Sequence, residues 1–353
     1  MSLHEHRKAI DQLDEQIVQL LNERTQHVLE IGAIKMQAGE EIYAPHRELA
    51  VLERVCKLNP GPITNDSLRA IYREIMSSAL SLEKSMTIAY LGPEATFTHQ
   101  AAIRKFGSSL HYLPLKTIAD VFFEVSKNRA DYGVVPVENS TEGVVTHTLD
   151  MFVDSDLKVV SQIVLPIQYC LASFGRRDKI KKLFAHPQAL AQCRGWVQHH
   201  LPHAEILETS SNARSAQLAK GQKSSAAITG LLAAEHYELP ILEANIQDNA
   251  ANATRFLVLG RQCPPPTGRD RTSLMFSIAD KIGALHQALA PIRRHHLNMT
   301  KIESRPSKRK AWEYFFFVDL DGHQQEEKVA KAIEQLGKHC NFVKVLGSYP
   351  RAE

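Results

Sequence analysis

The chain opens with a stretch that reads MSLHEHRKAIDQLDEQIVQLLNERTQHVLEIGAIKMQA over residues 1–38. At 100° per residue, its apolar residues fall on one face of a helix, centred on Ile17. The members of this apolar stripe are Ile10, Leu13, Ile17, Leu20, Leu21, Val28 and Ile31. Gly39, which follows directly, is a typical residue after a helix C-terminus. The stretch therefore predicts one long amphipathic helix that ends near Gly39.

Two cations interrupt this apolar stripe. Arg24 and Lys35 fall at about 340° and about 0° on the helical wheel, where apolar side chains belong. Burying an unpaired charge costs several kcal/mol. The two residues lie about 16 Å apart along the axis, and their long side chains can reach toward each other. They predict a small bound molecule with two negative groups. Alternatively, both side chains snorkel out of the stripe or pair with acids on a neighbouring helix.

The length of this helix indicates a second copy of the chain. It would be about 50 Å long, which is too long for a compact helical region of 85 residues. Its stripe therefore needs a partner of similar length, and a second subunit would supply one. Arg7 lies about 26 Å along the axis from Arg24. If Arg7 contacts the same ligand, it does so from the second subunit.

Composition narrows the class of protein. A chain of 353 residues predicts two or three domains. Its longest apolar runs are too short to span a bilayer, and the N-terminal residues have no apolar signal core. The net charge is 42 − 39 = +3, which does not indicate nucleic-acid binding. The five cysteines are scattered without a CxxC pair, so we expect neither zinc nor disulfides and a cytoplasmic location.

Three regions follow one another along the chain. Residues 1–85 are helical, with further helices starting at Pro45 and after Thr64. Residues 86–262 alternate between strands and helices and indicate an α/β region. Its expected strands are 87–91, 132–137, 163–172 and 225–229. After the stiff linker 264–266, the region 271–353 has the order βαββαβ, which is typical of ferredoxin-like folds. Its expected elements are strands 273–278, 297–304, 312–319 and 342–346 and helices 283–295 and 324–338.

The sequence contains no pattern typical of a nucleophile–base pair, a metal cluster or a nucleotide-binding loop. A helical site made of Arg and Lys suits a reaction that needs orientation and electrostatics rather than covalent chemistry. The unimolecular rearrangement of a dicarboxylate fits this requirement.

Specific motifs now indicate a family. Residues 1–85 resemble the helical type of chorismate mutase, through Arg7-x-x-Ile10-x-x-Leu13-Asp14, Glu23-Arg24, Lys35 and Arg47-Glu48. Residues 86–262 resemble prephenate dehydratases. The matching strings are Tyr90-Leu91-Gly92-Pro93-Glu94-Ala95-Thr96-Phe97, Val135-Pro136-Val137-Glu138-Asn139-Ser140, His186-Pro187-Gln188-Ala189-Leu190-Ala191-Gln192-Cys193 and Asn252-Ala253-Thr254-Arg255-Phe256.

Residues 271–353 resemble ACT regulatory domains, through Gly283-Ala284-Leu285 and Glu303-Ser304-Arg305-Pro306. Taken together, the chain resembles the bifunctional chorismate mutase–prephenate dehydratase family of phenylalanine biosynthesis. The resemblance implies a multidomain fold. It consists of an all-α mutase domain, a two-lobed α/β dehydratase domain like periplasmic binding proteins, and an α+β ferredoxin-like ACT domain.

The resemblance also implies residue roles in the mutase region. Arg24 and the partner subunit's Arg7 would bind the two carboxylates of chorismate. Lys35 would donate to its ether oxygen, and Glu48 would hold its ring hydroxyl. Arg47 also matches the motif, without a definite role. Bidentate Arg–carboxylate recognition provides the physical basis for such a site.

The mutase region departs from the pattern in two places, before Arg47 and near the end of the third helix. Some relatives carry an Asp three residues before Arg47, where this chain has Ala44. Relatives often have a Gln that also donates to the ether oxygen where this chain has Glu83, and Ala79 replaces a Ser. A carboxylate donates only when protonated. Either burial raises the pKa of Glu83, or Glu83 is a solvated residue at the helix end and the register is shifted.

In the dehydratase region, the resemblance implies that Thr254 donates a hydrogen bond to the departing hydroxyl of prephenate. Glu138, Asn139 and Gln188 are candidate substrate contacts, because α/β clefts place polar groups at strand ends. Arg255 is a candidate for holding a carboxylate. If 254–256 is extended, however, Thr254 and Arg255 point to opposite faces, and Arg255 alternatively makes a structural ion pair.

For the ACT region, the resemblance implies a phenylalanine site formed by Gly283, Ala284 and Leu285 with Glu303, Ser304, Arg305 and Pro306. The small Gly283 allows close approach of the backbone. Phenylalanine would bind between paired regulatory domains and shift the dehydratase toward a less active state. Without the resemblance, 303–306 would be read as a plain surface turn.

The complete prediction is a cytoplasmic homodimer or larger homo-oligomer that converts chorismate to prephenate and then to phenylpyruvate. It needs no cofactor or metal and binds neither nucleic acid nor membrane. Two alternatives remain at this point. One is a monofunctional dehydratase whose helical region only dimerises, and the other is a non-enzymatic amino-acid sensor.

Overall fold

The computed structural model describes residues 2–307 and 313–351. Contacts divide the chain into two compact units, Met1–Thr87 with Lys105–His111, and Ile88–Arg104 with Tyr112–Glu353. The first unit contains the helical region, and the second contains nearly all of the α/β and C-terminal regions. Among the described residues, no helix combines the length and apolar character that crossing a bilayer requires.

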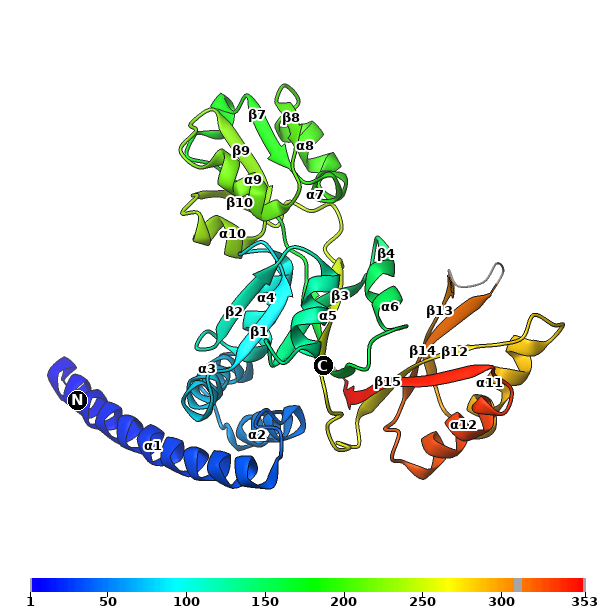
Figure 1. Ribbon diagram of the computed structural model, residues 1–353. Coiled ribbons are helices and arrows are strands. Elements are labelled where there is room, and N and C mark those ends of the chain that lie inside the picture. The colour runs from blue at the N-terminus through cyan, green and yellow to red at the C-terminus, as the bar shows by residue number, and fades with distance from the viewer. Residues whose placement is uncertain (1, 308–312, 352–353) are drawn as a thin grey trace. The chain divides into compact units, whose positions relative to one another are not determined.

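Three helices build the first unit: α1 (Leu3–Ala38), α2 (Pro45–Leu58) and α3 (Asn65–Glu83). Figure 1 shows α1 as one continuous helix, as the sequence predicts. Ser2 and Glu5 form a capping box at its start, and Gly39 ends it with φ 70°. Thr64 caps α3 through a hydrogen bond from the Ser67 amide. Local capping chemistry therefore sets the ends of these helices.

The apolar stripe of α1 is open in the single chain. Ile10 and Leu13 are each 55% exposed, and Ile17 is 52% exposed. In α1, whose residues are all described, only Gly32 is buried. Within the unit, α1 packs mainly against α3. The fold of one chain thus leaves most of this stripe uncovered.

The second unit contains two α/β lobes. The first lobe has a sheet in the order β2-β1-β3-β11-β5, with the short β4 on β3. Its strands are β1 (Thr87–Leu91), β2 (His111–Leu115), β3 (Tyr132–Asn139), β4 (Gly143–Val144), β5 (Lys158–Pro166) and β11 (Ala253–Gly260). Its helices are α4 (Phe97–Phe106), α5 (Ile118–Ser126) and α6 (Thr146–Met151). The long strands β3 and β11 run antiparallel, side by side, in the middle of this sheet.

The second lobe has a sheet in the order β10-β6-β9-β7-β8. Its strands are β6 (Cys170–Ala172), β7 (Lys182–Ala185), β8 (Glu205–Glu208), β9 (Ser225–Thr229) and β10 (Ile241–Ala244). A 3-10 turn, Arg177–Lys179, and four helices complete it: α7 (Pro187–Gln192), α8 (Arg194–His200), α9 (Asn212–Ala219) and α10 (Leu231–His236).

The prediction of one strand over 163–172 is wrong. β5 ends at Pro166 in the first lobe, and β6 begins at Cys170 in the second. Between them the backbone amide of Ile167 donates to Asn252 O at 2.9 Å, and that of Tyr169 donates to Gln247 Oε1 at 3.0 Å. Both strands are largely buried, so their apolar residues read as one run. The segment is a crossing between lobes.

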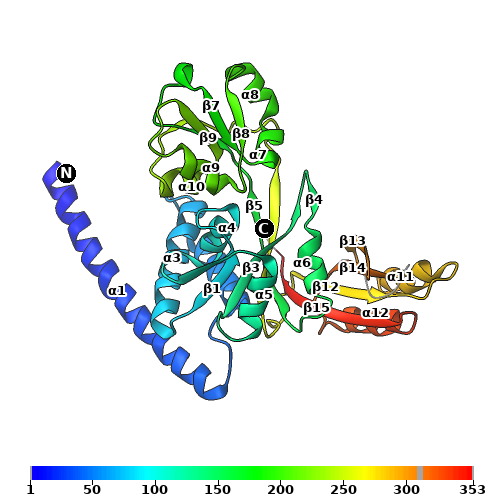
Figure 2. The same cartoon turned by 45° about the horizontal axis from the view of Figure 1, so that its top comes forward.

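The C-terminal region forms a third sheet in the order β13-β14-β12-β15, with the predicted succession βαββαβ. Its strands are β12 (Asp270–Ser277), β13 (Met299–Pro306), β14 (Tyr314–Asp321) and β15 (Phe342–Pro350), and its helices are α11 (Ala284–Arg294) and α12 (Glu327–Gly337). Both views show the two helices side by side along this sheet (Figure 2). The predicted strand 312–319 starts at Trp312, which lies outside the described residues.

The third sheet shares a hydrophobic core with the first lobe. Met275, Phe317 and Tyr349 from the third sheet cluster with Val135 and Leu257 from the first lobe. All five are nearly or fully buried. The opposite face of the third sheet packs against α11 and α12 in a separate cluster. The Pro-rich segment after residue 262 therefore joins two bodies that pack directly on each other.

Candidate active sites

Neither cation in the stripe of α1 forms a salt bridge within 4.0 Å among the residues that the structure describes, although Glu83 lies near enough to Lys35 to be affected by its charge. Arg24 is half-buried, and its Nη1 atom is buried without a hydrogen-bond partner within the described chain. Lys35 Nζ donates to the carbonyl oxygen of Ile42 at 2.9 Å. A buried, unsatisfied guanidinium nitrogen is costly. Arg24 is therefore suited to bind an anion from outside the chain.

Glu83 lies against the C-terminal part of α1, at Gly32. A Cβ atom on Gly32 would lie 2.7 Å from Glu83 Oε2, so glycine leaves the space that this carboxyl group occupies. Burial raises the pKa of Glu83, and the nearby charge of Lys35 opposes that shift only partly. Of the two interpretations of Glu83, the structure favours the half-buried carboxyl group over the solvated helix end.

Glu48, in the first turn of α2, is held by two donors. Tyr43 donates its hydroxyl hydrogen to Glu48 Oε2 at 3.0 Å, and Lys105 Nζ lies 2.8 Å from the same oxygen. Ala44 is the N-cap residue of this helix and makes no side-chain capping hydrogen bond. An Asp at this position could accept from the first-turn amides, so the Ala44 departure removes a cap.

Arg7 and Arg47 are both exposed. Arg7 and Arg24 lie on the same continuous helix, about 26 Å apart along its axis. One chain therefore does not bring Arg7 to the Arg24 end of the site. Arg47 follows the N-cap of α2 by three residues and lies beside His46, whose pKa is lowered by burial and by the charges of Lys35 and Arg47.

The structure brings two predicted dehydratase residues together. Asn139 ends β3, and Thr254 lies directly opposite it near the start of β11. The Asn139 Nδ2 group donates to Thr254 Oγ1 at 2.8 Å and also to Asn252 Oδ1 at 2.9 Å. Because Asn139 donates to this oxygen, the hydroxyl hydrogen of Thr254 remains available to another acceptor.

Three polar residues missed by sequence reasoning extend this pair to the second lobe. Asn252 Nδ2 donates to Gln192 Oε1 at 2.5 Å, and Gln192 Nε2 donates to Thr141 Oγ1 at 3.2 Å. Gln192 belongs to α7 of the second lobe, so the network joins both lobes. Gln188, exposed on the same helix, precedes Gln192 by four residues and shares its face. The spacing of Asn252 and Thr254, two residues apart, is a signal that could have identified Asn252.

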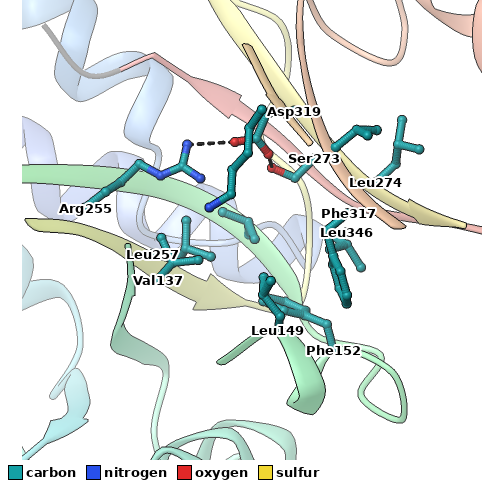
Figure 3. A pocket seen from close by; sticks show the side chains of 13 residues that line it. Val137, Leu149, Phe152, Arg255, Leu257, Ser273, Leu274, Phe317, Asp319 and Leu346 are labelled. Carbon is teal, nitrogen blue, oxygen red and sulfur yellow. Dashed lines mark hydrogen bonds and ion pairs between the residues drawn. The ribbon is translucent and has the colours of Figure 1, made fainter. Parts of the chain in front are cut away.

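Glu138 and Arg255 point away from this pair. They lie opposite each other in β3 and β11, one residue from Asn139 and Thr254, so strand alternation places them on the other face. Arg255 Nη1 lies 2.7 Å from Asp319 Oδ2, and Lys301 Nζ lies 2.8 Å from Glu138 Oε2. Figure 3 shows Arg255 directed toward Asp319. Arg255 thus takes the alternative of a structural ion pair, and both residues contact the third sheet.

A small cavity of about 20 Å³ lies beside this ion pair, with room for about one water molecule. Val137, Leu149 and Phe152 line its apolar side (Figure 3). Asp319 also accepts a hydrogen bond from Ser273 at 2.5 Å. The side chains of Arg255 and Asp319 are only 13% and 7% exposed. This junction between lobe and third sheet is therefore a largely buried ionic contact.

The residues that were predicted to bind phenylalanine occupy separate parts of the C-terminal region. Gly283 precedes α11 with φ 77°, Ala284 is buried, and Leu285 packs against the core beneath α11. On β13, Glu303 is half-buried, while Ser304 and Pro306 are exposed. Arg305 pairs with Asp150 of α6, at 3.2 Å. Among the described residues, no hydrogen bond or ion pair joins the Gly283 turn to 303–306.

Three family models match the chain in the predicted order. Chorismate mutase type II matches residues 6–84, prephenate dehydratase matches 88–264, and the ACT domain matches 272–338. No group of three or more His, Cys, Asp or Glu side chains suited to a metal ion occurs in the part of the chain that the structure describes.

Relatives match the whole chain. A bifunctional chorismate mutase/prephenate dehydratase of Aquifex aeolicus is 49% identical over 99% of this chain and 98% of its own length. Another, of Neisseria gonorrhoeae, is 45% identical over 98% of this chain and 96% of its own. The chain belongs to the bifunctional chorismate mutase/prephenate dehydratase family. The family and the multidomain fold class predicted from the sequence are thereby confirmed.

A crystal structure of prephenate dehydratase from Arthrobacter aurescens in complex with L-Phe shares the fold of the dehydratase and ACT domains. Its TM-score is 0.71 with 35% identity, covering 76% of this chain and 90% of that one. The enzyme domains argue against a non-enzymatic sensor. Full-length similarity to bifunctional relatives argues against a helical region that only dimerises.

Proposed function

We propose that this chain catalyses two consecutive reactions, chorismate to prephenate in its mutase domain and prephenate to phenylpyruvate in its dehydratase domain. The single observation that carries the proposal is the similarity to bifunctional relatives over the full length and in the same domain order. The site residues below are proposed on the geometry of each domain.

In the mutase domain, cations hold a dianion that rearranges without covalent help from the protein. Arg24, with its unsatisfied buried nitrogen, binds one carboxylate, and Arg7 of the partner subunit binds the other. Lys35 donates to the ether oxygen, where negative charge develops as the C–O bond breaks. Glu83, with its raised pKa, is the second donor to this oxygen when protonated.

In the dehydratase domain, Thr254 helps a hydroxyl group to leave. As the carboxylate departs as carbon dioxide, the electron pair of the breaking C–C bond enters the ring and expels hydroxide. Thr254 donates its hydroxyl hydrogen to the leaving oxygen, and Asn139 donates to Thr254 Oγ1 and fixes its orientation. The products are carbon dioxide, phenylpyruvate and hydroxide, and the hydroxide becomes water when it takes up a proton from the solvent. Gln188 and Gln192, on α7 of the other lobe, are candidate substrate contacts, and Gln192 already accepts a hydrogen bond from Asn252.

The active species is a homodimer or a larger homo-oligomer. The apolar stripe of α1 is more than half exposed at Ile10, Leu13 and Ile17, and it extends over a helix of about 54 Å. A second α1 matches this length, and it would bring the partner's Arg7 toward Arg24. Sedimentation should therefore give at least a dimer, and Ile17→Glu should lower both the association state and mutase activity.

Feedback by phenylalanine is the regulatory part of the proposal, with the effector bound by the 283–285 turn and the 303–306 strand end of paired ACT domains. The Arthrobacter aurescens relative crystallised with L-Phe supports it. Gly283 leaves open space where a Cβ would lie, so the backbone there is accessible to a ligand. A cytoplasmic location is proposed with it, on the cysteine pattern alone.

The test is to supply chorismate to the full chain and to identify the product that accumulates. The unmodified chain should release phenylpyruvate, more slowly when phenylalanine is added. Thr254→Ala should accumulate prephenate, while Arg24→Met should consume chorismate far more slowly and still convert supplied prephenate. A chain that converts prephenate but never consumes chorismate would establish the monofunctional alternative instead.

A further inference from the structure

A short segment of the matched dehydratase region packs into the helical unit. Residues Lys105–His111 belong to that unit, although they lie within the dehydratase match 88–264. The Phe106 and Tyr43 rings lie 5.0 Å apart between centroids. Ser108 donates from its amide and its hydroxyl to Glu74 Oε2, at 3.0 and 2.6 Å. The segment is therefore docked by several independent contacts on α3 and on the residues just before α2.

One of these contacts reaches a proposed mutase residue. Lys105 Nζ lies 2.8 Å from Glu48 Oε2, and the Tyr43 hydroxyl donates to the same oxygen at 3.0 Å. Within the described chain, Glu48 Oε1 receives no hydrogen bond. The Lys105 and Glu48 side chains are only 21% and 13% exposed. Two donors therefore fix one carboxylate oxygen and leave the other for a ligand hydroxyl.

We propose that Lys105 is a positioning residue for the mutase reaction, supplied from outside the mutase domain. This rests on the proposed function, in which Glu48 Oε1 accepts the ring hydroxyl of chorismate. A carboxylate in a mostly buried setting loses solvation, and a hydrogen-bonded cation offsets that loss. A carboxylate that is anchored at one oxygen also loses less side-chain freedom when it binds the substrate.

Lys105 lies outside the region that matches the chorismate mutase family, which is residues 6–84. Lys105 is also the penultimate residue of α4, which starts at Phe97 in the other unit. Substrate binding by the mutase domain therefore depends on a residue of the dehydratase region.

The experiment compares full-length variants in a direct assay of chorismate consumption. Lys105→Met removes the cation and keeps much of the stem, and it should raise the KM for chorismate about tenfold with little change in kcat. Lys105→Arg should restore most of the loss. Kinetics with supplied prephenate should not change, and they also report that the variant is folded. Lys105→Gln serves the same purpose if the Met variant is unstable.

Two controls separate positioning from docking. Ser108→Ala removes the hydroxyl hydrogen bond to Glu74 and leaves Glu48 unchanged. Arg104→Met replaces an exposed cation of α4, the helix that also contains Lys105. Both should leave the chorismate KM unchanged. In a Glu48→Gln background, Lys105→Met should have no further effect, because the pair is already broken.

Each outcome has a defined meaning. If Glu48→Gln impairs the mutase while Lys105→Met does not, the role of Lys105 is wrong and the proposed function stands. Full additivity of the two substitutions, or an equal loss in Ser108→Ala, also overturns the proposal and leaves a docking contact. If Glu48→Gln leaves the mutase intact, the assignment of Glu48 fails, and the role of Lys105 fails with it.

Discussion

The two candidate sites differ in how much of each site one chain supplies. At the dehydratase site, Asn139, Thr254, Asn252 and Gln192 are linked by hydrogen bonds across both lobes. At the mutase site, Arg24 has a buried nitrogen without a partner in the described chain, and the apolar stripe around it is exposed. One chain joins the polar residues of the dehydratase site, whereas the proposed mutase site takes Arg7 from a second copy.

Two arginines express this difference. Arg255 is paired with Asp319 and lies next to Glu138, and its side chain is 13% exposed. The charges of Asp319 and other neighbours outweigh the burial that alone would lower the pKa of Arg255, so that pKa is raised. Arg24 has no such acid among the described residues. One arginine therefore stabilises a domain junction, and the other is available to a ligand.

The largest effect is expected at the dehydratase site. Thr254→Ala removes the proposed donor to the leaving hydroxyl, and its dehydratase kcat should fall about 10³-fold. Thr254→Ser keeps the hydroxyl and should retain most activity, while mutase activity should be unchanged in both. The measurement is phenylpyruvate formation from supplied prephenate. A Thr254→Ala chain that keeps a normal kcat would remove Thr254 from the mechanism.

The paired arginine should matter most for stability. Arg255→Met leaves Asp319 buried without its cation, and it should lower the free energy of unfolding of its unit by about 3 kcal/mol. Urea unfolding, followed through loss of dehydratase activity, measures this change. Arg255→Met combined with Asp319→Leu should recover part of the loss, because an apolar pair replaces an isolated charge. If the double variant is no better than the single one, the ion pair is not the cause.

Replacing the unpaired Arg24 should affect activity more than stability. Arg24→Met should lower mutase kcat/KM about 100-fold, since a charged hydrogen bond to a carboxylate is lost. It should not destabilise the chain, because no partner in the chain is left behind. Chorismate kinetics and urea unfolding of the same variant check both halves. A stability loss as large as that of Arg255→Met would mean that Arg24 is paired after all.

Local sequence features were sufficient to predict the three helices of the mutase region and the order of elements in the ACT region. Ser2, Gly39, Pro45 and Thr64 set the helix ends by capping and backbone chemistry that act within a few residues. The order of strands and helices in the ACT domain follows from periodicity in the same way. The crossing after Pro166 was missed because both flanking strands are buried, so no change of pattern marks the change of sheet.

The partners of the site residues could not be predicted, because they are distant in sequence. Strand alternation indicates that Thr254 and Arg255 face opposite ways, but it does not reveal that Arg255 meets Asp319, 64 residues later. Lys105 reaches Glu48 over a separation of 57 residues. The partner of a residue in such a contact depends on how helices and strands pack together, and a single sequence does not reveal that packing.

The smallest expected effect concerns Glu83. At this position the mutase site has a carboxyl group, which donates a hydrogen bond only when it is protonated. Burial raises the pKa of Glu83 in the folded chain, so the folded state binds more protons than the unfolded state just above the ordinary pKa of 4.5. The contribution of this group to stability is therefore present at low pH. It is lost as pH rises through the folded-state pKa.

Mutase activity should follow the same direction, because only the protonated carboxyl group donates to the ether oxygen. Mutase kcat should fall several-fold as pH rises from 5 to 8, by analogy with other general-acid groups. Glu83→Gln, which donates at every pH, should flatten this profile and exceed the unmodified chain at the alkaline end. The matched control is Glu53→Gln, on α2. A flat profile for the unmodified chain would exclude Glu83 as a donor and leave Lys35 alone at the ether oxygen.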